Sequence, residues 1–205
     1  MFKSRLFKGE NDFKIHWNES LATNKIANEL FSYFPLNDFT PIVFICIGTD
    51  RSTGDSLGPL VGTQLLNKHL PNNFYCYGTL DDPIHAVNLQ EKLALIQQQF
   101  INPFIVGIDA CLGQSQHVGT IQIKEGPLKP GAGVNKSLPN VGNIHMTGIV
   151  NISGFMEYFV LQNTRLNLVM NIATIISESI YKAGLLYTFD QKIVNSGHET
   201  QKDSL

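Results

Sequence analysis

Continuous apolar runs along this chain alternate with segments of helical periodicity. The runs at 41–48 and 104–109 contain no regular polar positions, so they indicate strands buried on both faces, as in a parallel sheet. A further strand is predicted at 74–79 and a short one at 144–151. Apolar and polar residues alternate at 118–123, which is typical of a half-exposed strand.

In the segments between these runs, apolar residues recur at helical spacing. It predicts helices at 19–34, 60–70 and 84–100, and one long helix or two in tandem at 154–186. Pro35 ends the first helix. The residues expected to face inward from the third helix are Val87, Leu89, Leu93, Ile96 and Phe100. This order predicts an α/β fold in a single domain, with a mostly parallel twisted sheet and helices on both faces.

Three segments follow from this pattern. Residues 1–40 form an N-terminal lead-in and a helix, with an irregular start up to residue 17. Residues 41–187 form the α/β domain, and residues 188–205 form a polar tail. A proline- and glycine-rich stretch at 126–143 has no periodicity, and a loop of this length inside a domain is usually functional or disordered.

Composition limits the function classes. The chain has 205 residues, a hydrophobic share of 43% and a net charge of −2, which fits a packed globular domain without general affinity for nucleic acid. Its three cysteines lie far apart in sequence, which suits a reducing cytoplasm and suggests no disulfide framework. No apolar run approaches the roughly 20 residues of a membrane span, so we expect a cytoplasmic protein that does not bind membranes.

Two carboxylates lie where these buried strands are expected to end. Asp55 belongs to an acidic, glycine-rich turn at 48–58, and Asp109 follows the run at 104–108 directly. Sites of open α/β sheets lie at the carboxyl ends of the strands, so Asp55 and Asp109 are expected to face each other in one cleft. Such a pair suits a hydrolase, because nearby carboxylates separate their pKa values into an acid and a base. The alternative role of Asp55 is a helix N-cap.

His145 is the third candidate for this site. Asp55, Asp109 and His145 together would form a ligand set for a divalent metal such as Zn, Ni or Fe, with open positions for water. Without a metal, His145 would orient one carboxylate. The alternative is a histidine held by hydrogen bonds for structural reasons.

Four further residues are predicted to support binding at the same cleft: Asp50, Gly54, Asp82 and His85. Asp82 has an alternative role as a helix cap. The glycine-rich turn also suggests phosphate binding, but Asp50 and Asp55 would repel phosphate. Cys111 with a histidine base is a conceivable nucleophile, although no recognised motif surrounds it and a small buried thiol is the alternative.

Four segments carry a family resemblance. They are Ile-Gly-Thr-Asp-Arg-Ser-Thr-Gly-Asp-Ser-Leu-Gly-Pro at 47–59, Gly-Thr-Leu-Asp-Asp-Pro-Ile-His-Ala-Val-Asn-Leu at 78–89, Ile-Asp-Ala-Cys-Leu-Gly at 108–113 and Gly-Pro-Leu-Lys-Pro-Gly-Ala-Gly-Val at 126–134. These segments resemble the YyaC family of sporulation proteins from spore-forming Gram-positive bacteria. The resemblance covers about 41–185.

More remotely, the chain is similar to the spore germination protease. In that family an Asp in a Thr-Pro-Asp-Ala-Leu-Gly-Pro turn and an Asp in an Asp-Ala pair are implicated as catalytic acids, and they match Asp55 and Asp109. The chain also resembles hydrogenase maturation proteases, in which a Glu, an Asp and a His bind nickel in the substrate. There, Asp55 matches the Glu, Asp109 the Asp and, by chain order, His145 the His. This chain departs from the germination protease in being much shorter, a difference that bears on both the zymogen mechanism and the substrate.

The resemblance implies a sporulation-associated peptidase with an aspartate dyad. Its expected substrates are proteins or peptides, among them small acid-soluble spore proteins, in the cytoplasm of the developing spore or the mother cell. The alternative is a non-catalytic relative that binds a peptide or protein in the same cleft. The sequence gives no sign of a nucleic-acid or membrane partner and is compatible with an oligomer.

Overall fold

The computed structural model describes residues 12–35, 37, 39–131 and 138–202, with side chains as far as 192. The elements in chain order are β1 (Phe13–His16), α1 (Ala22–Tyr33), β2 (Ile42–Cys46), α2 (Leu57–Leu66), β3 (Phe74–Tyr77), α3 (Leu89–Gln99), β4 (Phe104–Gly113), η1 (Ser115–His117), β5 (Thr120–Glu125), β6 (Ile144–Ile152), α4 (Glu157–Gln162) and α5 (Leu166–Lys202).

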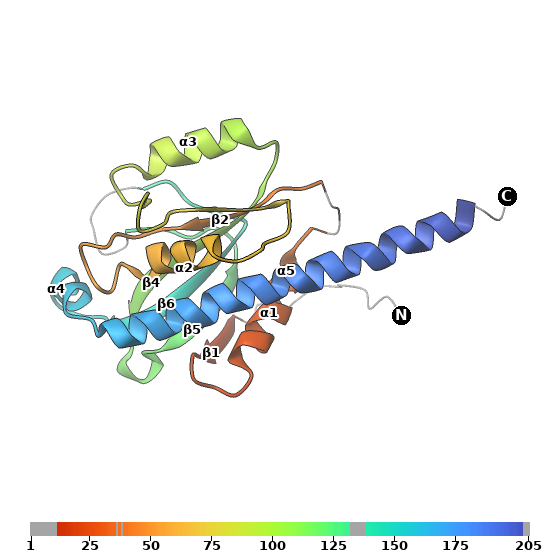
Figure 1. The fold of residues 1–205 in the computed structure, drawn as a ribbon. Coiled ribbons are helices and arrows are strands. Elements are labelled where there is room, and N and C mark those ends of the chain that lie inside the picture. Colours follow the sequence, from red (N-terminus) through yellow and green to blue (C-terminus); the bar gives the residue numbers. More distant parts are fainter. Residues whose placement is uncertain (1–11, 36, 38, 132–137, 203–205) are drawn as a thin grey trace.

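Six strands form one sheet in the order β1-β5-β6-β4-β2-β3 (Figure 1). The four strands β6, β4, β2 and β3 are parallel, while β5 pairs antiparallel with both β6 and β1. All five residues of β2 are buried, as expected for a strand covered on both faces. The predicted fold class, a mostly parallel α/β sheet with helices on both faces, is confirmed.

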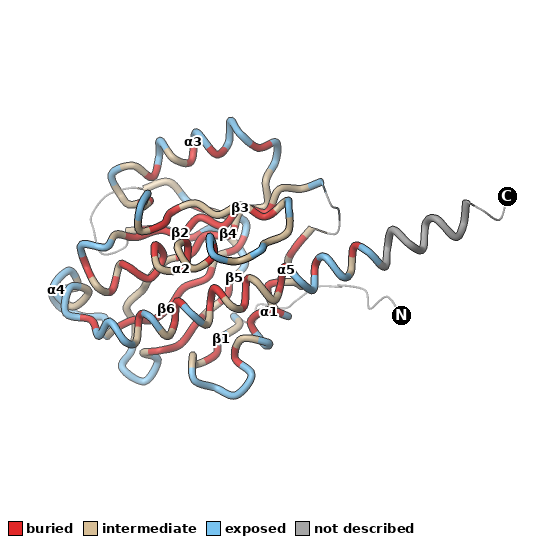
Figure 2. The backbone as a smooth tube through the Cα atoms, in the orientation of Figure 1, coloured by how far each residue is buried: buried red, intermediate tan, exposed pale blue. Residues whose placement is uncertain are grey.

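Helices cover the two faces unequally. The larger hydrophobic cluster joins α1, α2 and α5 to one face of the sheet, and the smaller one joins α3 to the other face. Figure 2 shows the buried residues concentrated in the strands and on the inward sides of the helices. The long loop after β5 completes the smaller cluster through Leu128 and Val141, which form an isolated bridge. Residues 132–137 of that loop lie outside the described part of the chain.

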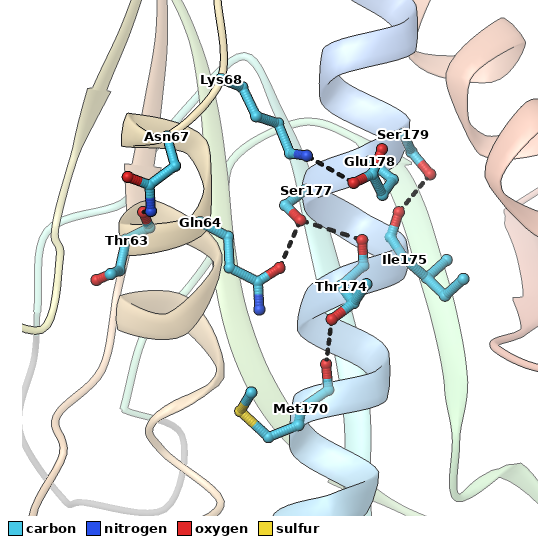
Figure 3. A network of polar contacts seen from close by, with 10 residues as sticks. All are labelled: Thr63, Gln64, Asn67, Lys68, Met170, Thr174, Ile175, Ser177, Glu178 and Ser179. Carbon is cyan, nitrogen blue, oxygen red and sulfur yellow. Dashed lines mark hydrogen bonds and ion pairs between the residues drawn. The ribbon is translucent and has the colours of Figure 1, made fainter.

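A polar network fixes α2 on α5 (Figure 3). The hydroxyl of Ser177 is fully buried and donates to Gln64 Oε1, 2.7 Å away. One turn along the interface, Lys68 Nζ lies 2.6 Å from Glu178 Oε1. A buried hydroxyl needs such a partner, so the Ser177–Gln64 contact fixes the orientation of α2 on α5, and the more exposed ion pair of Lys68 lies just after the end of α2. Because α2 follows the acidic turn directly, this network also anchors that turn.

β4 is longer than predicted. The sequence suggested that the strand ends at Asp109, but it continues to Gly113. Pairing with β6 explains the extension, because the ladder runs from Val106↔Ile144 through Asp109↔Thr147 to Gly113↔Ile152. Asp109 therefore lies inside a strand and not after one.

Other boundaries also differ from the prediction. Residues 13–16, expected to be irregular, form β1 because they pair with β5. α3 begins only at Leu89, so Val87 precedes the helix and is 84% exposed instead of buried. The predicted tandem arrangement at 154–186 corresponds to α4 and α5, but α5 continues to Lys202. Whether 40 and 187 are domain boundaries stays a prediction.

Among the helices of the described residues, none combines the length and the apolar character that crossing a membrane requires.

Gly58 tests how tightly α2 is seated on the end of β2. A Cβ added at Gly58 would lie 2.1 Å from the carbonyl oxygen of Ile47. We expect Gly58→Ala to lower the free energy of unfolding by about 2–3 kcal/mol, measured by urea denaturation, because α2 must shift. Gly126→Ala is the control: φ is +89° there, but the space is open, so only the backbone cost of about 1 kcal/mol applies. Equal losses in both variants would contradict this packing.

Candidate active site

The acidic turn after β2 is closed by main-chain hydrogen bonds. The Gly48 N–H donates to Ile84 O at 2.8 Å, and the Thr49 N–H donates to Asp55 O at 3.1 Å. Gly48 has φ +147°, and a Cβ there would lie 1.9 Å from Asp55 O, so only glycine fits this close approach. The turn therefore holds Asp55 at the carboxyl end of β2, as the sequence predicted.

Asp109 enters the site from the middle of β4. Its Oδ1 accepts a hydrogen bond from the Ala110 N–H at 2.8 Å. Burial raises the pKa of Asp109 to about 8, and the charge of Asp55 adds to this rise, while the Ala110 N–H opposes it. Asp109 therefore carries a proton at neutral pH.

Asp55 has a smaller shift in the same direction. Burial raises its pKa, and the nearby Ser52 hydroxyl opposes part of this rise. That hydroxyl is buried and lies close enough to Asp55 to lower its pKa, although within the described structure the two groups do not meet full hydrogen-bond geometry. The two acids thus differ in proton affinity, which a general acid and a general base require.

Both carboxylates line one cavity of about 520 Å³. Its wall is largely apolar, with Leu112 from β4, Leu128 from the long loop and Leu161 from α4. Charged side chains also line it: Arg51, Lys129 and Glu157. A pocket of this size with a mostly apolar wall and a few convergent polar groups is typical of a substrate site.

His145 is not brought to the two aspartates. It does not line the cavity, and its Nδ1 lies 2.9 Å from Gly126 O. Its strand pairs His145 with Gly107, whereas Asp109 is paired with Thr147, two residues further along. Two strand residues span roughly 6.6 Å, so the main chain of His145 is offset by that length from the residue paired with Asp109.

The predicted ligand set of Asp55, Asp109 and His145 is therefore wrong in its geometry. In the part of the chain that the structure describes, no three side chains of His, Cys, Asp or Glu are grouped so that they could hold a metal ion. His145 has instead the alternative role, a histidine whose ring contacts a main-chain carbonyl.

Only one of the four predicted binding residues lines the cavity. That residue is His85, in the segment before α3. Asp50 is exposed outside the cavity, and Asp82 is paired with Lys92 at 2.7 Å. Gly54 is buried beneath α4, where its N–H donates to Leu161 O at 2.9 Å, so it serves packing.

The thiol of Cys111 also lines the cavity. Burial raises the pKa of Cys111 to about 11, and the Thr147 hydroxyl only partly opposes this rise. A thiol with so high a pKa is a poor nucleophile at neutral pH, which favours the alternative of a buried thiol.

Sequence reasoning missed the part of the site that α4 provides. Glu157, Tyr158 and Leu161 line the cavity, although they belong to a segment read only as helical. The available signal was the cluster of large apolar residues at the start of that segment. In the structure two residues of this cluster, Phe155 and Tyr158, are 93% and 60% exposed. Thr147, on β6 beside Asp109, was missed for lack of the strand register.

Because the pKa of Asp109 is raised, replacement of this residue should increase the free energy of unfolding by an amount that grows with pH. Between pH 4 and pH 8 the unfolded chain loses the Asp109 proton and the folded protein keeps it, so the stability of wild type falls across this interval. Asp109→Asn removes the group. We expect the free energy of unfolding of the variant to match that of wild type near pH 4 and to exceed it by at least about 2 kcal/mol at pH 8, measured by urea denaturation. The full shift corresponds to about 5–6 kcal/mol, and the open side of the cavity lowers this value.

Asp50→Asn, on the exposed part of the same turn, is the control and should follow the wild-type pH profile. A constant difference between Asp109→Asn and wild type from pH 4 to pH 8 would show that burial does not raise the pKa of Asp109.

Comparisons with known proteins identify the family. Residues 14–179 match the family described as "Protein of unknown function (DUF1256)". The chain is 53% identical over 180 residues to "Uncharacterized protein YyaC" of Bacillus subtilis (strain 168), covering 87% of each chain.

Among solved structures, the chain is similar to the [NiFe] hydrogenase maturation protease HycI from Thermococcus kodakarensis KOD1, with a TM-score of 0.42 and 16% identity. The match covers 71% of this chain and 95% of that one, and the likeness is too distant to indicate an activity. The family match and the identity to YyaC confirm the predicted resemblance, and the chain belongs to the DUF1256 family.

Proposed function

We propose that this protein is a peptidase in which Asp55 and Asp109 activate one water molecule. The observation that carries the proposal is the placement of both carboxylates on one cavity with pKa values raised to different extents. The match of Asp55 and Asp109 to the acids implicated in the germination protease supports peptide-bond hydrolysis as the reaction.

The unequal proton affinities assign the roles. Asp55, the less shifted acid, serves as the base: it takes a proton from water, whose oxygen attacks the carbonyl carbon of the scissile peptide bond. Asp109, protonated at neutral pH, gives its proton to the leaving nitrogen as the carbon–nitrogen bond breaks. The products are a carboxyl group and an amine. Proton transfer from Asp55 to Asp109, directly or through water, restores the starting state.

The substrate class follows from the family resemblance. Similarity to sporulation proteins and to the germination protease supports a protein substrate, such as small acid-soluble spore proteins, in the cytoplasm of the developing spore or the mother cell.

One observation favours a second candidate function, a non-catalytic binding protein. The cavity wall is largely apolar, and α4 and its preceding turn expose Phe155, Tyr158 and Phe159 nearby. Such a surface suits the capture of a peptide or protein whether or not hydrolysis follows.

Paired substitutions distinguish the two functions. Asp55→Asn and Asp109→Asn should each lower the rate of peptide cleavage at least roughly a hundred-fold, because neither group can serve as both acid and base. The assay incubates purified protein with small acid-soluble spore proteins and follows new N-termini by mass spectrometry. The controls are Asp50→Asn and His145→Ala, which lie outside the cavity and should cleave within about twofold of wild type.

Equal cleavage by wild type and both dyad variants would exclude the dyad as the catalyst. Capture of the proteins by wild type without cleavage, lost in the variants, would favour the binding function. A large loss in His145→Ala would restore a role for that histidine.

The pH dependence of cleavage tests the assigned roles. Activity should fall above about pH 8 as Asp109 loses its proton, and fall on the acidic side as Asp55 gains one. Ser52→Ala removes the hydroxyl that opposes the rise in the pKa of Asp55, so the acidic limb should move to higher pH while the alkaline limb stays near pH 8. The measurement is kcat/KM against pH, and a shift of the alkaline limb alone would reverse the assignment.

A further inference from the structure

β4 extends beyond its neighbour β2 at the cavity. The ladder between them runs from Ile42↔Phe104 to Cys46↔Ile108, and its last bond is donated by the Ile47 N–H to Ile108 O at 2.7 Å. β2 then turns away at Gly48, while β4 continues for five residues to Gly113. The far side of this extension pairs with β6 as far as Gly113, with a register shift in β6 between the partners of Cys111 and Leu112. On the near side, no strand among the described residues pairs with β4 after Ile108.

Hydrogen bonds elsewhere in β4 indicate which main-chain groups face the open side. The Phe104 N–H donates to Pro41 O and Ile108 O accepts from Ile47, so even-numbered residues point toward β2. Odd-numbered ones point toward β6, since Ile105 O accepts from Asn143 and Gly113 O accepts from Ser153. The strand alternation therefore directs the N–H and C=O groups of Ala110 and Leu112 to the side that β2 has left.

This open edge lies at the cavity. Asp109, Ala110, Cys111 and Leu112 all line it. The Ala110 N–H, which would be the first ladder donor, is occupied by Asp109 Oδ1 at 2.8 Å. An unpaired strand edge is a template for another extended chain, and proteins protect such edges with charged groups or cover. Here the carboxyl group of Asp109 occupies the first donor.

We propose that a substrate peptide binds in extended conformation as an added strand along Ala110–Leu112, in the position that β2 vacates. The proposal rests on the proposed function and specifies its substrate class: an unfolded or extended segment recognised through its main chain. Alternate side chains of the added strand would face the apolar cavity wall, and the others would face the opposite side.

Strand addition also connects binding to chemistry. A substrate carbonyl beside Ala110 would accept the N–H that Asp109 Oδ1 holds in the free protein. That donor would polarise the carbonyl as water attacks it. Loss of the hydrogen bond from the Ala110 N–H, which favours the ionised form of Asp109, would raise the pKa of Asp109 further. Asp109 would therefore keep its proton until it gives this proton to the leaving nitrogen.

The binding experiment uses Asp55→Asn, so that cleavage does not interfere. A random library of fluorescein-labelled decapeptides is screened by fluorescence polarisation, and the tightest binder is resynthesised with one N-methyl group at each position in turn. Strand addition predicts a period of two: methylation weakens binding at least about tenfold at alternate positions and less than about twofold between them. Losses without a period of two, or no saturable binding at about 1 mM, would overturn the proposal.

The role of the open edge of β4 is tested by comparing two variants of the protein, Leu112→Pro and Leu112→Ala. Both replace the leucine side chain with a smaller one, but only proline removes the main-chain N–H, which the alternation along β4 directs to the open edge. The proline variant should bind the peptide at least about tenfold more weakly than the alanine variant, with far-UV circular dichroism confirming that both are folded. Equal affinities in two folded variants would overturn the role of this edge.

The two proposals fail in distinguishable ways. A period of two in binding, with no cleavage of the same peptide by wild type, would reject the peptidase and retain strand addition as the binding mode. Cleavage by wild type, with no period of two, would retain the peptidase and reject strand addition.

Discussion

Removal of the Asp109 carboxyl from bulk water is the constraint on which the candidate site depends. Because Asp109 lies within β4 and not in a loop after it, protein surrounds its carboxyl except at the cavity. An ionised carboxylate in such a place is costly, so the group keeps its proton to about pH 8. Asp55, on the more accessible turn, is shifted less. One strand and one turn thereby give unequal proton affinities to two residues of the same type.

The unequal lengths of β2 and β4 create the space between these acids. β2 ends at Cys46 because the chain must turn at Gly48 to place α2 against the sheet, and α5 holds α2 there through the buried Ser177 hydroxyl. β4 has no such turn and continues along β6. The gap beside the longer strand becomes the cavity. α4 closes one side of it through the hydrogen bond from the Gly54 N–H to Leu161 O. The same mismatch thus accounts for the cavity and for the open strand edge.

Sequence patterns were sufficient where burial alone decides the structure. The apolar runs at 41–48 and 104–109 identified the central strands, and the carboxyl-end rule brought Asp55 and Asp109 together. Sequence patterns were insufficient where the pairing between strands decides the structure. Residues 109–113 begin with an aspartate and end with a glycine, which interrupts the apolar run, yet β6 holds them in a strand. His145 was placed in the correct strand, but its distance from Asp109 depends on register, and two residues of offset separate it from the site. The surface of α4 could not be assigned because its packing partner is a distant turn.

Recognition through an open edge would leave specificity to the rest of the cavity. Main-chain hydrogen bonds are nearly the same for every sequence, so Ala110 and Leu112 would select for an extended chain and not for particular side chains. Discrimination would then come from the apolar wall, where Leu128 and Leu161 face each substrate side chain that enters, and from the charges of Arg51 and Lys129. Folded proteins present few unpaired extended segments, so their geometry alone would exclude them. A site built in this way would favour a chain with an accessible extended segment, because such a chain could pair with Ala110 and Leu112 beside the two acids.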